Sequence, residues 1–164
     1  MALTALAAGL AACGDSEGDA PYTVPETGTI LYDGTFSTTA WGVPYATDAT
    51  TAQFVWTGEG RARVVVAQMT ARPATDDTPA RVMTNFTVED VGVERQPDGS
   101  YTLITTDPIQ GGGTMSGRYS AFYTGRLWGT ISGREISFSV SYKFSPSPEE
   151  PLLISEFVGQ VAGS

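Results

Sequence analysis

Apolar and polar residues alternate along most of the chain after residue 28, which is the spacing of β-strands. The clearest case is ISFSVSYKF, residues 136–144, in which five apolar residues alternate with four polar ones. One face of such a strand is buried and the other meets water. No stretch keeps the spacing of an amphipathic helix, so the pattern predicts an all-β domain.

A short turn before this strand predicts a hairpin. Residues 132–135, SGRE, place glycine at the first central position of a two-residue turn. Such a turn sets the register of the two strands, with Gly129 opposite Phe138 and Gly125 opposite Tyr142. An aromatic ring facing a glycine fills the space of the missing side chain.

Further turn signals divide the rest of the chain into seven or eight strands, from about residues 29–37 to LLISEFVGQV at 152–161. The signals are GEG at 58–60, QPDG at 96–99 and SPSPEEP at 145–151. Strands in simple succession favour an antiparallel up-and-down β-barrel of about eight strands, because closure removes the exposed sheet edges. Gly111, Gly112 and Gly113 are interpreted as a flexible loop, since no Gly-Lys-Ser/Thr follows them.

The N-terminal region has a different character. Residues 1–12, MALTALAAGLAA, carry no charge and are too few to span a bilayer, which needs about 20 residues. Their length suits the apolar segment of a signal peptide, although the usual positive residues before it are missing, as in a truncated signal. Residues 14–27 are rich in Gly, Asp, Glu, Thr and Pro, as tethers are. The predicted divisions are 1–12, 13–27 and 28–164.

Residues 10–14, LAACG, resemble the lipobox of bacterial lipoproteins, and Cys13 is the only cysteine of the chain. The resemblance implies that Cys13 carries a lipid anchor after cleavage of the signal peptide, and hence that the membrane is a partner. A free cysteine near the terminus is the alternative. In bacterial lipoproteins, an aspartate directly after the lipidated cysteine favours retention in the inner membrane. Gly14 occupies that position here, so the resemblance favours the outer membrane.

A second resemblance covers about residues 28–161. The stretches RVMTNFTVEDVGVERQPDGSYTLI, GRLWGTISGREISFSVSYKF and LLISEFVGQ are similar to the calycin-like β-barrel domain of bacterial lipoproteins. That resemblance implies a barrel shaped like those of lipocalins and avidins, without a defined activity. The sequence shows neither the lipocalin Gly-x-Trp signature nor the polar set of a biotin site.

Composition and charge exclude several classes of function. The net charge is −9, which disfavours nucleic acid as a partner. Histidine is absent, so no serine has the usual base, and we expect no enzyme activity. The acidic pairs lack the spacing of a calcium loop, so we expect no metal site and no cofactor.

Four residues are candidates for ligand binding. Trp41, Tyr45 and Trp56 flank a segment interpreted as a long loop, WGVPYATDATTA, and could roof the mouth of the barrel. Glu156 lies on the same face of its predicted strand as the apolar residues Leu152, Ile154 and Val158. If this face points inward, the Glu156 carboxylate lies in the lumen, where burial of its charge is unfavourable unless the charge is paired. Ordinary packing of the aromatic residues, and a rim or bulge position for Glu156, are the alternatives.

Two functions follow from a barrel of this size. The first is a non-enzymatic structural or interaction module, anchored in the envelope, with its lumen filled by side chains and an envelope protein as a possible partner. The second is a barrel that binds a small apolar ligand or a glycan in its lumen. The large residues Phe138, Tyr142 and Phe144 are predicted to point inward, which favours a filled lumen.

Overall fold

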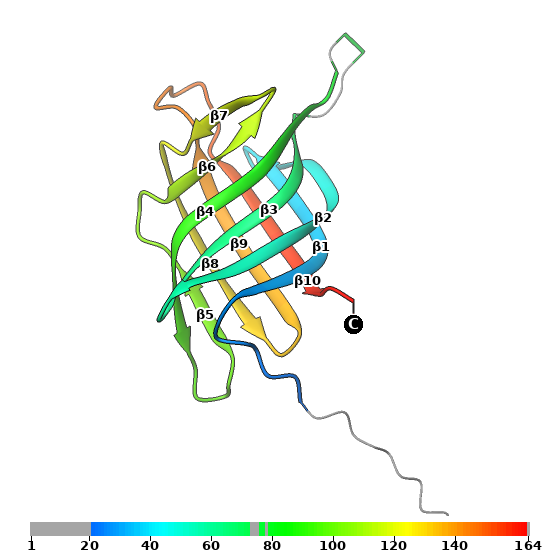
Figure 1. Ribbon diagram of the computed structural model, residues 1–164. Coiled ribbons are helices and arrows are strands. Elements are labelled where there is room, and N and C mark those ends of the chain that lie inside the picture. The colour runs from blue at the N-terminus through cyan, green and yellow to red at the C-terminus, as the bar shows by residue number, and fades with distance from the viewer. Residues whose placement is uncertain (1–20, 73–75, 78, 164) are drawn as a thin grey trace, which may run out of the picture.

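The computed structural model describes residues 21–72, 76–77 and 79–163, and these residues contain β-strands and no helix (Figure 1). The side chains of Tyr45 and Arg72 are not described. The strands are β1 (Thr29–Ala40), β2 (Val43–Gly58), β3 (Arg61–Arg72), β4 (Arg81–Arg95), β5 (Tyr101–Ile104), β6 (Gln110–Met115), β7 (Arg118–Ala121), β8 (Thr124–Ser132), β9 (Glu135–Lys143) and β10 (Leu153–Val161).

Eight of these strands close into a barrel, and every pairing is antiparallel. The order around the barrel is β3-β2-β1-β10-β9-β8-β5-β4, and the pairing of β3 with β4 closes it. The hairpin β6–β7 pairs with the first half of β4, while β5 pairs with its last residues. The predicted all-β, antiparallel barrel of eight strands is confirmed, with one extra hairpin at its edge.

The middle of the lumen is filled with side chains. Phe138 and Phe157 stack with ring centroids 5.3 Å apart, and Phe86 lies edge-on to Tyr142 at 5.0 Å. Burying each such side chain contributes about 1.5–3 kcal/mol to stability. The largest fully buried side chains are Tyr32, Tyr142, Phe36, Phe54, Phe86, Phe138, Phe157, Met69, Met83, Leu103, Leu127 and Ile131.

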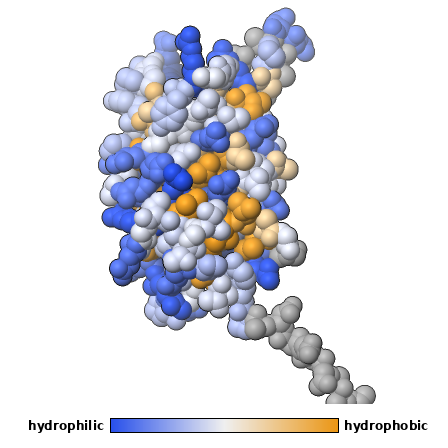
Figure 2. Space-filling view, viewed as in Figure 1, coloured by the Kyte–Doolittle hydropathy of each residue, from blue (hydrophilic) through white to orange (hydrophobic). Residues whose placement is uncertain are grey.

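The predicted register of the β8–β9 hairpin is confirmed. Gly129 pairs with Phe138 and Gly125 with Tyr142. Trp128, between the two glycines, points outward and is 46% exposed. The outward positions of β9 are three serines, Glu135 and Lys143, whereas apolar surface is visible among the strands β1, β2 and β3 (Figure 2).

Gly111, Gly112 and Gly113 form part of strand β6 and not a loop, so that prediction is wrong. The reason is the close approach of neighbouring strands. A Cβ on Gly112 would overlap the carbonyl oxygen of Ser120, and a Cβ on Gly113 would lie 2.7 Å from Cγ of Met83. The glycines are therefore needed for room inside a crowded sheet.

The last part of the predicted tether packs against the barrel. Val24 is buried, Trp56 Nε1 donates to the carbonyl oxygen of Pro25 at 2.7 Å, and the Tyr101 hydroxyl donates to Glu26 Oε1 at 2.6 Å. Residues 21–27 thus cover the end of the barrel near the β2–β3 turn (Figure 1). The prediction of a free tether through residue 27 does not hold for these residues.

Candidate ligand-binding site

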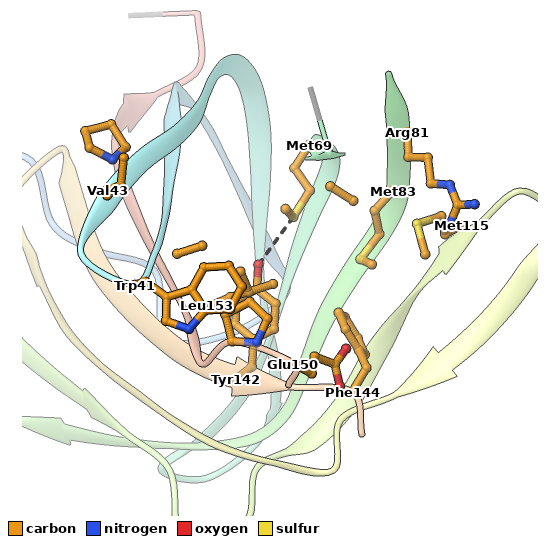
Figure 3. Close-up of a pocket in the computed structure, with 14 residues that line it drawn as sticks. Trp41, Val43, Met69, Arg81, Met83, Met115, Tyr142, Phe144, Glu150 and Leu153 are labelled. Carbon is orange, nitrogen blue, oxygen red and sulfur yellow. Dashed lines mark hydrogen bonds between the residues drawn. The ribbon is translucent and has the colours of Figure 1, made fainter. Parts of the chain in front are cut away.

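A pocket of about 520 Å³ lies at the end of the barrel that carries the β1–β2 turn, and Figure 3 shows the residues that line it. Residues 21–27 lie at the other end of the barrel (Figure 1). The pocket is formed by the β1–β2 turn, the ends of β3, β4, β6 and β9, and the segment that leads into β10. Most of the residues around it are apolar; they are Ala40, Trp41, Val43, Pro44, Met69, Ala71, Arg81, Met83, Met115, Tyr142, Phe144, Glu150, Pro151 and Leu153. The volume and the apolar character suit a small organic ligand.

Trp41 stands at the rim of this pocket because it occupies the first position of a two-residue hairpin turn. Ala40 pairs with Val43, and the two residues between them have positive φ, 50° at Trp41 and 73° at Gly42. A two-residue turn of this kind matches the twist of the flanking strands, and glycine fits it well. A tryptophan at positive φ costs about 1–2 kcal/mol. The turn holds the indole 74% exposed at the pocket, where a ligand would cover it.

A chain of buried hydroxyl groups lies at the floor of the pocket. Thr38 Oγ1 and Ser155 Oγ are 2.8 Å apart, and Ser155 Oγ is 3.0 Å from the Tyr142 hydroxyl. That hydroxyl donates in turn to Met69 Sδ at 4.0 Å (Figure 3). Donation from Thr38 to Ser155 to Tyr142 to Met69 satisfies every hydroxyl proton, so the network is internally complete.

Two charged side chains line the pocket, Glu150 and Arg81. Arg81 is exposed, so its guanidinium group stays hydrated. Glu150 is half-buried, and its Oε2 atom is buried without a hydrogen-bond partner among the described residues. A buried carboxylate oxygen without a partner is costly, so this atom has unused capacity to meet a donor or a cation.

The aromatic residues predicted from the sequence do not share one site. The segment read as a loop is the first part of β2, a strand that runs the whole height of the barrel. Trp41 therefore lies at one end of β2 and Trp56 near the other, in separate hollows. Tyr45 lies in β2 beside the register shift between Thr38 and Thr39.

The predicted inward position of Glu156 is wrong. Ser155, Phe157 and Gly159 are the buried residues of β10, and Glu156 faces outward. The apolar residues that share its parity are themselves exposed: Leu152 at 47%, Ile154 at 39% and Val158 at 49%. Stacking of Phe157 on Phe138 fixes this orientation from the inside, so Glu156 is not in the lumen.

A second hollow lies at the Trp56 end, between the β2–β3 turn and residues 26–28. Its main polar groups are already engaged, because Trp56 Nε1 and the Tyr101 hydroxyl hold Pro25 and Glu26. Burial, and then the hydrogen bond to Glu26, raises the pKa of Tyr101. These contacts fasten the N-terminal segment, so the hollow offers few free groups to a ligand.

Sequence reasoning missed three residues of the pocket wall, Met69, Met83 and Met115. Apart from Met1 they are the only methionines of the chain, and each lies near the end of a strand. Their spacing along the sequence carries no motif. Cys13, the predicted lipidation site, lies outside the described residues.

Comparisons with known proteins support the fold. No family model matches the chain, and no curated protein matches it. Among solved structures, a crystal structure named as a "putative outer membrane protein" from Bacteroides fragilis is similar, with a TM-score of 0.63 and 17% identity. The similarity covers 82% of this chain and 50% of that one, so this chain spans about half the length of its structural neighbour.

Neither a membrane-spanning helix nor a metal site built from Cys, Asp and Glu occurs among the described residues. No helix there is long and apolar enough to cross a membrane. No group of three or more Cys, Asp or Glu side chains in the same residues could hold a metal ion.

Proposed function

We propose that this protein is a non-enzymatic binding module that holds a small apolar ligand in the pocket at the Trp41 end of the barrel. One observation carries the proposal: the lumen is filled below Tyr142, but an open apolar space of about 520 Å³ remains above it. Ligand sites commonly have about 300–1,000 Å³ and an apolar wall with few polar groups. Methionines adapt to ligand shape because their side chains are unbranched and polarisable.

The chemistry of the wall supports binding without catalysis. The nearest hydroxyl group, that of Tyr142, is engaged with Ser155 and Met69. The only acid and the only base among the lining residues are Glu150 and Arg81. An apolar ligand would gain about 25 cal/mol per Å² of surface removed from water, which is enough for micromolar binding in a pocket of this size.

We propose further that Cys13 is lipidated and attaches the barrel to the bacterial cell envelope, at the outer membrane in preference to the inner. The lipobox resemblance supports this, as does the name of the Bacteroides fragilis neighbour. The chain reaches the barrel at the Trp56 end, so the Trp41 pocket would open away from the membrane (Figure 1). The outward serines and lysine of β9 favour water and not acyl chains around that part of the wall.

Ligand binding is tested with the full chain carrying Cys13→Ser, which removes the site of lipidation. A panel of fatty acids, haem and oligosaccharides is read by tryptophan emission and by thermal shift. We expect an apolar member to change the emission and to raise the Tm by several degrees, because a ligand at about 100 times its Kd stabilises by about 2.7 kcal/mol.

Two tryptophan variants locate the binding. Trp41→Ala should abolish the emission change, whereas Trp128→Ala, on the outer wall, should keep it. Equal loss in both variants would place the ligand elsewhere. If no member of the panel changes the tryptophan emission or the Tm, the other function is favoured, a structural module that contacts an envelope protein.

The anchor is tested by intact mass spectrometry of protein extracted from a bacterial envelope. We expect a chain that begins at Cys13 and carries two or three acyl groups, and release from the membrane by Cys13→Ser. An unmodified chain that begins at Met1 would contradict the proposal.

A further inference from the structure

We infer that the Trp41 pocket contains a site for one soft monovalent cation, Cu⁺ or Ag⁺, held by the thioethers of Met69, Met83 and Met115. All three side chains line the pocket, and Figure 3 shows them on neighbouring strands along one side of it. Every methionine of the described chain is therefore in this one place. The inference concerns the same pocket as the proposed function, but it does not rest on an apolar ligand.

The strand pairing places the three methionines in a row. Met69 on β3 is the direct partner of Met83 on β4, and Met83 is the direct partner of Met115 on β6. Directly opposite residues have Cβ atoms about 4.5–5.5 Å apart. An unbranched side chain with three rotatable bonds can bring its sulfur across that distance, so the three sulfurs can converge on one ion.

Thioether chemistry selects the ion. Methionine sulfur is a soft, neutral ligand that favours Cu⁺ and related cations, whereas Ca²⁺ and Mg²⁺ prefer oxygen ligands. The chain has no histidine, and its one cysteine, Cys13, lies outside the described residues. A soft cation bound by the barrel would therefore have thioethers as its only strong ligands.

The unpartnered carboxylate oxygen of Glu150 supports a cation in this pocket. Three thioethers leave the charge of the ion uncompensated, which is unfavourable in an apolar space. Glu150 Oε2 is buried without a hydrogen-bond partner among the described residues, and its residue lines the same pocket. Arg81 also lines it, but it is exposed, so water screens its charge.

Packing alone is the competing explanation, because methionine often fills gaps in a core. Met69 and Met83 are indeed 1% exposed. Gap filling, however, predicts no common response of the three sulfurs to an added ion. A measurement on each methionine separately distinguishes the two explanations.

The test uses the full chain with Cys13→Ser and ¹³C-labelled methionine methyl groups. Four methionines give at most four signals, those of Met1 and of the three pocket residues. On titration with silver nitrate in chloride-free buffer, we expect the three pocket signals to shift together and to stop at one Ag⁺ per chain. Cu⁺ under anaerobic conditions should act in the same way, and Zn²⁺ should have no effect.

Variants separate ligation from packing. Met83→Leu keeps the volume but removes the central sulfur, and it should weaken Ag⁺ binding at least about 100-fold, because even outer-shell changes alter metal affinity about 10–100-fold. Ile131→Leu, in the core outside the pocket, should leave the affinity unchanged. If Met83→Leu fails to fold, the half-buried Met115 offers Met115→Leu instead.

Three results would overturn the inference. They are a shift of Met1 alone, shifts that continue without an endpoint at one Ag⁺, and unchanged Ag⁺ affinity in the folded methionine variants. Glu150→Gln should weaken Ag⁺ binding severalfold while the stoichiometry stays at one. Because these readouts follow the sulfurs and not Trp41, failure here would leave the apolar-ligand proposal to its own test.

Discussion

Gly129 and Phe138 face each other across β8 and β9, and a Cβ added to Gly129 would lie 2.5 Å from Cβ of Phe138. Real Cβ atoms do not come so close. The same added atom would also overlap the carbonyl oxygen of Ser137. Glycine is therefore required at this position for space, since the large side chain opposite already fills the lumen there.

The first prediction compares the two faces of this hairpin. Gly129→Val should destabilise the protein by about 1–3 kcal/mol or more, because overfilling a packed core forces backbone and side chains to move. Ser137→Val, on the outward face of β9, should be nearly neutral. Urea unfolding of the two variants measures the difference, and equal destabilisation would mean that the packing at Gly129 is misjudged.

This hairpin also shows what a sequence can predict. The turn at residues 132–135 is short, so it alone fixes which residues pair, and the predicted pairs Gly129–Phe138 and Gly125–Tyr142 are confirmed. Strand β10 follows a long connection, which does not determine the register of the strand or which of its faces is buried. Both faces of β10 carry apolar residues, and Ile154 and Val158 are exposed. The alternation of apolar and polar residues therefore predicts the wrong face for Glu156.

The candidate site was less accessible to prediction for a related reason. Met69, Met83 and Met115 come together only because β4 pairs with β3 along one edge and with β6 along the other. These contacts between strands are set by the pairing of β3 with β4, which closes the barrel, and by the pairing of the extra strand β6 with β4, and not by local spacing. Trp41 is predicted from its place beside a segment interpreted as a loop, but its separation from Trp56 depends on β2 being one long strand.

The second prediction concerns two buried tyrosines whose hydroxyl groups differ. Tyr32 Oη is buried with no hydrogen-bond partner among the described residues, whereas the Tyr142 hydroxyl bonds to Ser155. An unsatisfied buried group costs about 1–3 kcal/mol, so Tyr32→Phe should stabilise the protein and raise the Tm by a few degrees. Tyr142→Phe should lower stability by about 0.5–1.5 kcal/mol.

Thermal unfolding of both variants checks the pair, and a lower Tm for Tyr32→Phe would contradict it. The same burial, with a smaller contribution from Tyr22, raises the pKa of Tyr32 above the usual range of tyrosine. In the alkaline titration followed by absorbance, Tyr32→Phe should therefore remove one tyrosine that ionises above the usual range of tyrosine while the protein remains folded.

The third prediction concerns the turn between β4 and β5. Asp98 Oδ1 accepts from the Ser100 hydroxyl at 2.6 Å and from the Ser100 backbone nitrogen at 2.9 Å. These two bonds, the side-chain one first, lower the pKa of Asp98. The turn is therefore stabilised above the pKa of aspartate in the unfolded chain, and this contribution is lost as the pH falls through the lower folded value.

Ser100→Ala should raise the pKa of Asp98 towards its ordinary value, as measured by NMR titration of the carboxyl carbon. Ser139→Ala, on the outward face of β9, serves as the control and should leave the pKa of Asp98 unchanged. An unchanged Asp98 pKa in Ser100→Ala would mean that the Ser100 hydroxyl does not set it.

The last prediction concerns the N-terminal segment that covers the Trp56 end. Tyr101→Phe removes one of the contacts that hold the segment and leaves the Trp56–Pro25 bond and the Arg95–Glu26 ion pair, so amide exchange at Val24 should quicken. Tyr123→Phe, an exposed control, should leave the exchange at Val24 unchanged.

The Tyr101–Glu26 bond makes the segment sensitive to alkaline pH. Because burial and Glu26 raise the pKa of Tyr101, the contribution of Tyr101 to stability is complete below the unfolded tyrosine pKa of about 10 and is lost as the pH rises through the folded pKa. Exchange at Val24 in the original chain should therefore quicken above pH about 10 beyond the intrinsic base-catalysed rate, and this excess should be missing in Tyr101→Phe. Equal excess in both proteins would show that another group releases the segment.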